Sequence, residues 1–128
     1  MQESTDRILL CRLDDISVPG SRGLTVACGD HRSDIFLVRT TDGIFGYLNS
    51  CPHTGAPLDW VPDRFLSLDL AHIQCSTHAA LFRVHDGVCI AGPCIGDVLR
   101  PVPLMIDEEA VFLLRHELCS RRGAADMP

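Results

Sequence analysis

Two short motifs that each pair a cysteine with a histidine carry the clearest chemistry in the sequence. They read Cys51-Pro52-His53 and Cys75-Ser76-Thr77-His78, and 21 residues separate them. Two thiolates and two imidazoles form a ligand set that binds metal. We therefore predict Cys51, His53, Cys75 and His78 as metal ligands, against the alternative that they are ordinary core or surface residues.

The spacing within the motifs bears on which metal they bind. Zinc fingers usually take two cysteines from one loop and two histidines from another. Here each motif is mixed, and the single residue between Cys51 and His53 is cramped for chelating one tetrahedral ion. A two-iron, two-sulfide cluster is a wider target, in which neighbouring side chains reach different irons. A structural zinc module remains the alternative, and it predicts a colourless protein without redox activity.

The residues around both motifs resemble the Rieske [2Fe–2S] family, in which two histidines replace two cysteines on one iron. The first matching loop is residues 49–58, and the second is residues 73–78, followed by Phe82 and Asp86-Gly87. Gly92-Pro93-Cys94 stands where this family has the proline loop that covers the cluster. The resemblance covers residues 5–116 and implies an all-β fold, an antiparallel sandwich or barrel with a small cluster-binding subdomain.

The resemblance also implies a role for each ligand. Cys51 and Cys75 would bind the inner iron as thiolates, and His53 and His78 would bind the outer iron near the surface. Each imidazole would keep its second nitrogen toward solvent or a partner, where the electron leaves.

Four other positions indicate which kind of Rieske protein this is. High-potential members join the two loops by a disulfide at positions that correspond to Ala56 and Thr77, and neither is cysteine here. They also hydrogen-bond the cluster from a serine and a tyrosine at positions that are Ala80 and Phe82 here. Donors to cluster sulfur raise the potential, so their loss predicts a potential on the order of −150 mV.

The resemblance therefore implies a low-potential one-electron carrier and not a catalyst. We expect it to pass electrons from a flavin- or NAD(P)H-linked reductase to a terminal enzyme such as an oxygenase, as a cytoplasmic monomer. The chain is too short for the mononuclear-iron domain of an oxygenase, and Asp69-x-x-His72 is a chance resemblance to half of that site. Alternatives are a small subunit of a larger redox enzyme of the nitrite reductase type, or an iron–sulfur redox sensor.

Composition limits the other classes of function. A length of 128 residues with 46% hydrophobic residues fits one domain with a core. The net charge of −6 argues against nucleic acid or an anionic membrane surface as a partner. No apolar run is long enough for a membrane helix, and residues 1–7 are too polar for a signal peptide.

Short apolar runs between turn signals predict the strands that must position the motifs. The predicted strands are residues 8–13, 24–28, 34–39, 44–49, 101–106 and 110–115, with hairpin turns at Asp42-Gly43 and Asp86-Gly87. We expect the cluster-binding subdomain at about 46–97, a helical turn between Pro62 and Leu70, and a polar tail at 117–128.

The remaining cysteines and glycines receive simpler interpretations. Cys89 and Cys94 are predicted as packed free thiols in preference to a labile disulfide. Cys11 and Cys28 read as small core residues. Gly55 and Gly92 are expected to supply positive φ or a close backbone approach. The acidic residues Asp59, Asp63 and Asp69 suit either a docking patch or a solvated face.

Overall fold

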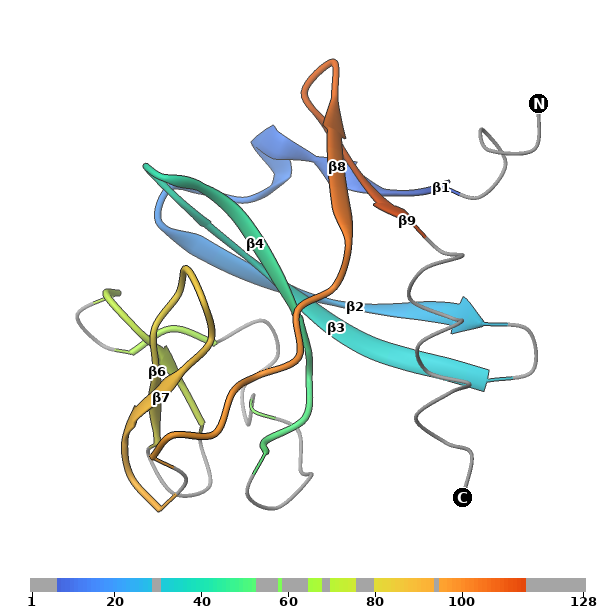
Figure 1. The fold of residues 1–128 in the computed structure, drawn as a ribbon. Helices are drawn as coiled ribbons and strands as arrows, with labels where there is room; N and C mark the ends of the chain where they lie inside the picture. Colours follow the sequence, from blue (N-terminus) through green and yellow to red (C-terminus); the bar gives the residue numbers. More distant parts are fainter. Residues whose placement is uncertain are drawn as a thin grey trace.

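The protein folds into three antiparallel sheets of three strands each (Figure 1). The computed structural model describes residues 7–28, 31–52, 58, 65–67, 70–75, 80–93 and 95–114, with the side chains of Cys28 and His31 left out. The strands are β1 (Arg7–Arg12), β2 (Gly20–Cys28), β3 (His31–Thr40), β4 (Gly43–Leu48), β5 (Ile73–Gln74), β6 (Leu81–Phe82), β7 (Cys89–Ala91), β8 (Leu104–Asp107) and β9 (Ala110–Leu114). The single helical element among these residues is a 3₁₀ turn at Leu13–Asp15. The predicted all-β antiparallel fold is confirmed.

The largest sheet is the meander β2–β3–β4. The predicted turn at Asp42-Gly43 joins β3 to β4, where Gly43 has φ of 138° and the Asp42 N–H donates to Thr40 Oγ1 at 3.1 Å. Strand β2 begins at Gly20, four residues before the predicted start, because Ser21 and Gly23 pair with Val38 and Phe36. These residues carry no apolar signal of their own, so the neighbouring strand decides their conformation.

The two ends of the described chain meet in the sheet β1–β9–β8. Ile8 pairs with Leu113, and Leu9 pairs with Phe112. The Arg7 guanidinium lies 4.2 Å from the centroid of the Phe112 ring, and its Nη1 is 3.2 Å from Asp107 Oδ2. No helix among the described residues is long and apolar enough to cross a membrane.

The third sheet, β5–β6–β7, is much smaller. The predicted hairpin turn near Asp86-Gly87 is confirmed, because residues 84–86 form the turn between β6 and β7. The helical turn predicted between Pro62 and Leu70 is wrong over residues 65–67, where Leu66 forms an antiparallel bridge with Ile73. Phe65 and Ser67 are buried while Leu66 is not, which is the alternation of a strand. The other residues of that range, apart from Leu70, lie outside the described part.

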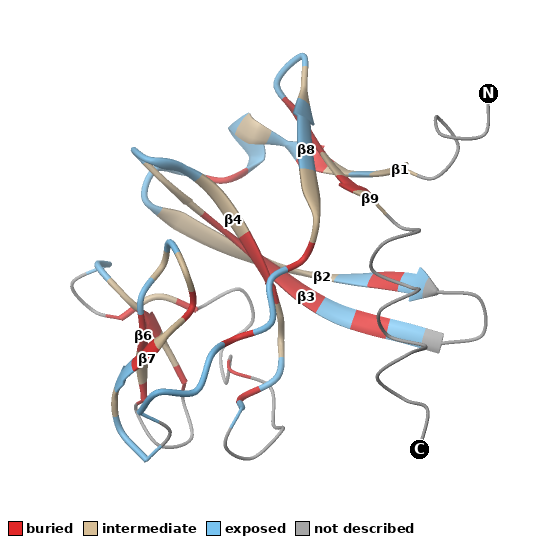
Figure 2. Cartoon of the chain, in the orientation of Figure 1, coloured by how far each residue is buried: buried red, intermediate tan, exposed pale blue. Residues whose placement is uncertain are grey.

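The buried residues of the described part form three apolar clusters. Figure 2 shows where the buried positions lie along the strands and loops. Two of the clusters lie between the β2–β3–β4 sheet and the β1–β9–β8 sheet, and they include Ile35, Leu37 and Leu113. The third packs the small sheet against β3 and β4. In it, the rings of Phe36 and Phe65 stack with centroids 4.3 Å apart. This third cluster also contains Cys51 and Cys75, so it is the one that concerns the predicted site.

Candidate metal centre

Cys51 lies three residues after the end of β4 and is 2% exposed. The segment around it is closed by Asn49, whose Oδ1 accepts a hydrogen bond from the Leu58 N–H at 2.7 Å. The Asn49 N–H donates to the Asp34 carbonyl at 2.8 Å, which fixes the segment to β3. Leu58 is fully buried. The first predicted histidine ligand, His53, belongs to the segment 53–57, which is outside the described residues.

Cys75 follows directly on β5 and is fully buried. Its N–H donates to the Ala80 carbonyl at 2.9 Å, so residues 75 and 80 are held together at the base of the second motif. The N–H of Gln74 donates to the Phe65 carbonyl at 2.9 Å. The second predicted histidine ligand, His78, belongs to the segment 76–79, which is also outside the described residues.

The fold brings the two cysteines, 24 positions apart in the sequence, into one apolar cluster. Neither cysteine forms a disulfide. Their common surroundings are apolar side chains, among them Leu58, Phe65 and Phe82. A thiolate buried among such groups is costly unless a cation neutralises it, and a metal supplies that charge. Two cysteines buried together where these motifs begin therefore fit a soft metal centre, such as iron bound by sulfur.

The segment after β7 packs against the second motif. Gly92 has φ of 103°, and a Cβ added there would lie 2.9 Å from Ala80 Cα. This confirms the positive φ and close approach predicted for Gly92. The other predicted glycine, Gly55, and the residue Cys94 lie outside the described residues.

Cys89 forms no disulfide, is 1% exposed, and donates from its Sγ to the Ala91 carbonyl at 3.2 Å. The prediction of a packed thiol in preference to a disulfide is confirmed for Cys89. Cys11 is likewise a buried free thiol in the core beneath the β1–β9–β8 sheet, as predicted. Burial is the main cause that raises the pKa of the Cys11 thiol.

Comparison with known proteins decides the family. The sequence matches the Rieske [2Fe–2S] domain over residues 6–115. This chain belongs to the Rieske [2Fe–2S] domain family. The [2Fe–2S] cluster of that family is accordingly its cofactor, and the buried thiols of this Rieske domain suit it.

Solved structures with the same fold come from carbazole 1,9a-dioxygenase systems. The Rieske domain superposes on a chain of the complex of reduced oxygenase and oxidized ferredoxin with a TM-score of 0.66 and 21% identity, covering 81% of this chain and 97% of that one. The ferredoxin from Nocardioides aromaticivorans IC177 superposes with a TM-score of 0.64 and 20% identity, covering 84% of this chain and 95% of that one. The terminal oxygenase from Novosphingobium sp. KA1 superposes with a TM-score of 0.69 and 18% identity, covering 84% of this chain but 29% of that one. No curated protein sequence matches this chain.

The two positions used to predict the potential are both buried. Ala80 is 1% exposed and Phe82 is fully buried in the same cluster as Cys75. Neither side chain has a hydrogen-bond donor. Among the described residues, no three histidine, cysteine or acidic side chains gather into a metal site, and two of the four predicted ligands are not among those residues.

Charged groups lie at the other end of the β6–β7 hairpin. Arg83 donates from Nε and Nη2 to the carboxylate of Asp86, at 3.0 and 2.6 Å. The hydrogen bond from Arg83 is the main cause that lowers the pKa of Asp86. His85 is two-thirds exposed, with its Nε2 3.6 Å from Asp86 Oδ2. The acidic residues Asp59, Asp63 and Asp69, considered above as a docking patch, lie outside the described residues.

Sequence reasoning missed the functions of two polar side chains. Asn49 belongs to the motif, yet its use as the acceptor that closes the loop was not predicted. An asparagine just before a Gly- and Pro-containing loop is a recognised turn signal, so the sequence offered a hint. The other is Tyr47, which lies two residues before Asn49 on β4 and is described below. Its hydrogen-bond partner is 37 residues away, and no local pattern points to it.

Proposed function

We propose that Cys51 and Cys75 bind one iron of the [2Fe–2S] cluster as thiolates, and that His53 and His78 bind the other. The observation that carries this proposal is that Cys51 and Cys75 are buried in the same core cluster. Each thiol stands at the start of a motif whose histidine follows within two or three residues. When bound, the cluster supplies a site that accepts and releases one electron.

We further propose that the protein is an electron carrier and not itself a catalyst. It takes electrons from a flavin- or NAD(P)H-linked reductase and passes them to a terminal oxygenase. The structural likeness to the dioxygenase ferredoxin supports this, because the match extends over 95% of that ferredoxin but only 29% of the terminal oxygenase. The runner-up is a small subunit of a larger redox enzyme, and a stable complex on affinity purification would favour it.

The carrier is proposed to work at the low end of the Rieske range of potentials. Ala80 and Phe82 provide no side-chain donor to sulfur, so no hydrogen bond from them stabilises the reduced cluster. The net charge of −6 acts in the same direction. Both effects make reduction of the cluster less favourable and so lower its midpoint potential.

The organisation proposed around this function is a single domain of residues 1–128 that works as a monomer in the cytoplasm. Residues of about 46–97 form the proposed cluster-binding subdomain, and the tail expected at 117–128 lies outside the described residues. Pairing between β1 and β9 supports the single domain, because it joins the two ends of the described chain. Neither nucleic acid nor membrane is expected as a partner.

An anaerobic redox titration followed by EPR tests the proposed function. The protein is purified, reconstituted with iron and sulfide, and reduced stepwise. We expect the EPR signal of a mixed cysteine–histidine cluster and a midpoint potential well below zero. A protein that stays EPR-silent after reconstitution and holds about one zinc would overturn the proposal in favour of a structural zinc module.

A further inference from the structure

Tyr47 links the large sheet to the small one. It lies on β4, is 3% exposed, and donates from its hydroxyl to the Val84 carbonyl at 2.6 Å. Val84 belongs to the turn between β6 and β7. Four residues after Tyr47 comes Cys51, and β6 begins directly after Ala80, the residue that closes the Cys75 motif. The hydrogen bond thus connects the two segments that carry the two cysteine–histidine motifs.

The phenol ring is held in place on both sides. Phe36 is its partner across the β3–β4 pair, with ring centroids 5.8 Å apart. On the other side, a Cβ added at Gly87 would lie 2.8 Å from Tyr47 Cε1, so the turn passes directly over the ring. Burial, with a smaller effect from Asp86, raises the pKa of Tyr47 to about 12. The hydroxyl therefore keeps its proton and remains a donor throughout the neutral range.

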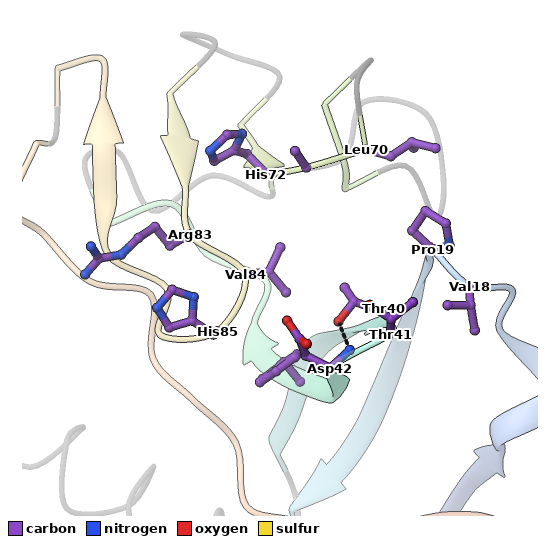
Figure 3. A pocket seen from close by; sticks show the side chains of 12 residues that line it. Val18, Pro19, Thr40, Thr41, Asp42, Leu70, His72, Arg83, Val84 and His85 are labelled. Atoms are coloured by element: carbon purple, nitrogen blue, oxygen red, sulfur yellow. Dashed lines mark hydrogen bonds between the residues drawn. The ribbon is translucent and has the colours of Figure 1, made fainter.

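Two depressions open beside the elements that this hydrogen bond joins. A groove of about 480 Å³ has a lining that includes Phe45, Leu70, His72 and Val84 (Figure 3). A second hollow of about 180 Å³ is lined by residues that include Tyr47, His85 and Val102. Phe45 and Val84 also pack against the core cluster that contains Tyr47, so the hydrogen bond and apolar contacts act together at this junction.

We propose that Tyr47 is a positioning residue of the redox site, which fixes the Cys51 and Cys75 motifs relative to each other. This inference rests on the ligand set proposed above. A cluster bound from two loops requires those loops to be held to within a fraction of an ångström. Strands β5, β6 and β7 have only two or three residues each, so their backbone pairing is a weak restraint. The Tyr47 hydroxyl adds a restraint that ties the second motif to the strand leading into the first.

The substitution Tyr47→Phe, which keeps the ring and removes the hydroxyl, tests this role in the cluster-loaded protein. We expect the cluster absorbance to be lost about five- to tenfold faster on warming, the size expected for one hydrogen bond to a partly buried carbonyl. We also expect a broader EPR signal and a shifted midpoint potential. Gly87→Ala is a second variant, because its methyl group would push the turn off the ring, and it should act in the same direction.

Thr25→Val is the matched control. It removes a hydroxyl that donates to Asp34 Oδ1 at 2.8 Å, but on the exposed face of the β2–β3 pair. If the EPR line shape and midpoint of Tyr47→Phe equal those of the wild type, and its cluster is lost no faster than that of Thr25→Val, the inference is overturned while the proposed function stands. If the wild-type protein itself takes up no cluster, the proposed function fails, and this inference fails with it.

Discussion

The large sheet and the small sheet of this protein are held together by different means. Strands β2, β3 and β4 have 9, 10 and 6 residues and pair continuously along their lengths. Strands β5, β6 and β7 have 2, 2 and 3 residues, with a register shift between β6 and β7. The large sheet is therefore stabilised by its own backbone ladder, whereas the small one is not.

The small sheet depends instead on side chains and on what they bind. Its residues pack against Phe36 and Tyr47, which belong to β3 and β4. The two predicted thiolate ligands lie in that same packing cluster. A metal centre bound from both motifs would cross-link the small region, as structural metals do in domains with little core of their own. The comparison therefore predicts that a bound cluster would stabilise the small sheet more than it stabilises the larger sheets.

The largest effect is expected from Cys75→Ser. Removing one thiolate should abolish the cluster absorbance and speed amide hydrogen exchange in β5–β7, with little change in β2–β4. Hydrogen-exchange mass spectrometry on the reconstituted protein measures both regions together. Cys11→Ser is the control, since Cys11 is also a buried free thiol but lies in the core of the larger sheets. Equal loss of cluster in both variants would contradict the ligand assignment.

Gly92→Ala should have the next largest effect, confined to the cluster region. Its Cβ would meet the Ala80 backbone at 2.9 Å, and its φ of 103° strains any other residue. We expect loss of unfolding free energy of about 1–3 kcal/mol together with weaker cluster retention. Gly96→Ala separates the two causes, because Gly96 has φ of 94° with nothing within 4 Å of the added methyl group. If Gly96→Ala releases the cluster as readily, strain and not the contact with Ala80 is responsible.

Gly46→Ala is the complementary change in the larger sheets. The added methyl would lie 2.7 Å from a methyl group of Val102 and 3.0 Å from methyl groups of Leu104 and Leu37. Overpacking of this kind costs roughly 1–3 kcal/mol of unfolding free energy, at the low end where flexible side chains yield. Denaturant unfolding should show the loss, while the EPR spectrum of the cluster stays as in the wild type. A changed spectrum would show that the two regions are not independent.

The smallest expected effect is on thermal stability and its dependence on pH, and it comes from the ion pair in the turn between β6 and β7. The pKa of Asp86 is lowered from 3.8 in the folded protein, so the Arg83–Asp86 pair stabilises the fold above that value, and this stabilisation is lost as the pH falls through the lowered pKa. Asp86→Asn should therefore melt slightly lower than the wild type at pH 7, and the difference should vanish in acid. Asp42→Asn, in the turn between β3 and β4, is the control, because no ion pair of Asp42 occurs among the described residues. Parallel melting curves from pH 7 downward would settle the point.

Turn residues and short apolar runs, which act over only a few residues, predicted much of the fold. The turns at Asp42-Gly43 and Asp86-Gly87 follow from the residues that tolerate positive φ, and both are confirmed. Short apolar runs predicted the positions of β1, β3, β4 and β9 to within three residues. Strand β8 begins at Leu104, three residues after its predicted start, and no strand ranges were predicted for β5, β6 and β7. The start of β2 and the extended conformation at Leu66 were not predicted, because Gly20–Gly23 and Leu66 adopt strand geometry through pairing with distant residues.

The sequence by itself determined the family and predicted the chemistry of the site. Two cysteine–histidine motifs define a mixed sulfur and nitrogen ligand set whatever the surrounding fold, because ligand preference is a property of the side chains. Only the tertiary structure decided that Cys51 and Cys75 share one buried cluster, that Gly92 lies against Ala80, and that Tyr47 reaches Val84. These contacts join residues far apart in the chain, and they form only when the sheets pack. No local pattern in the sequence encodes them.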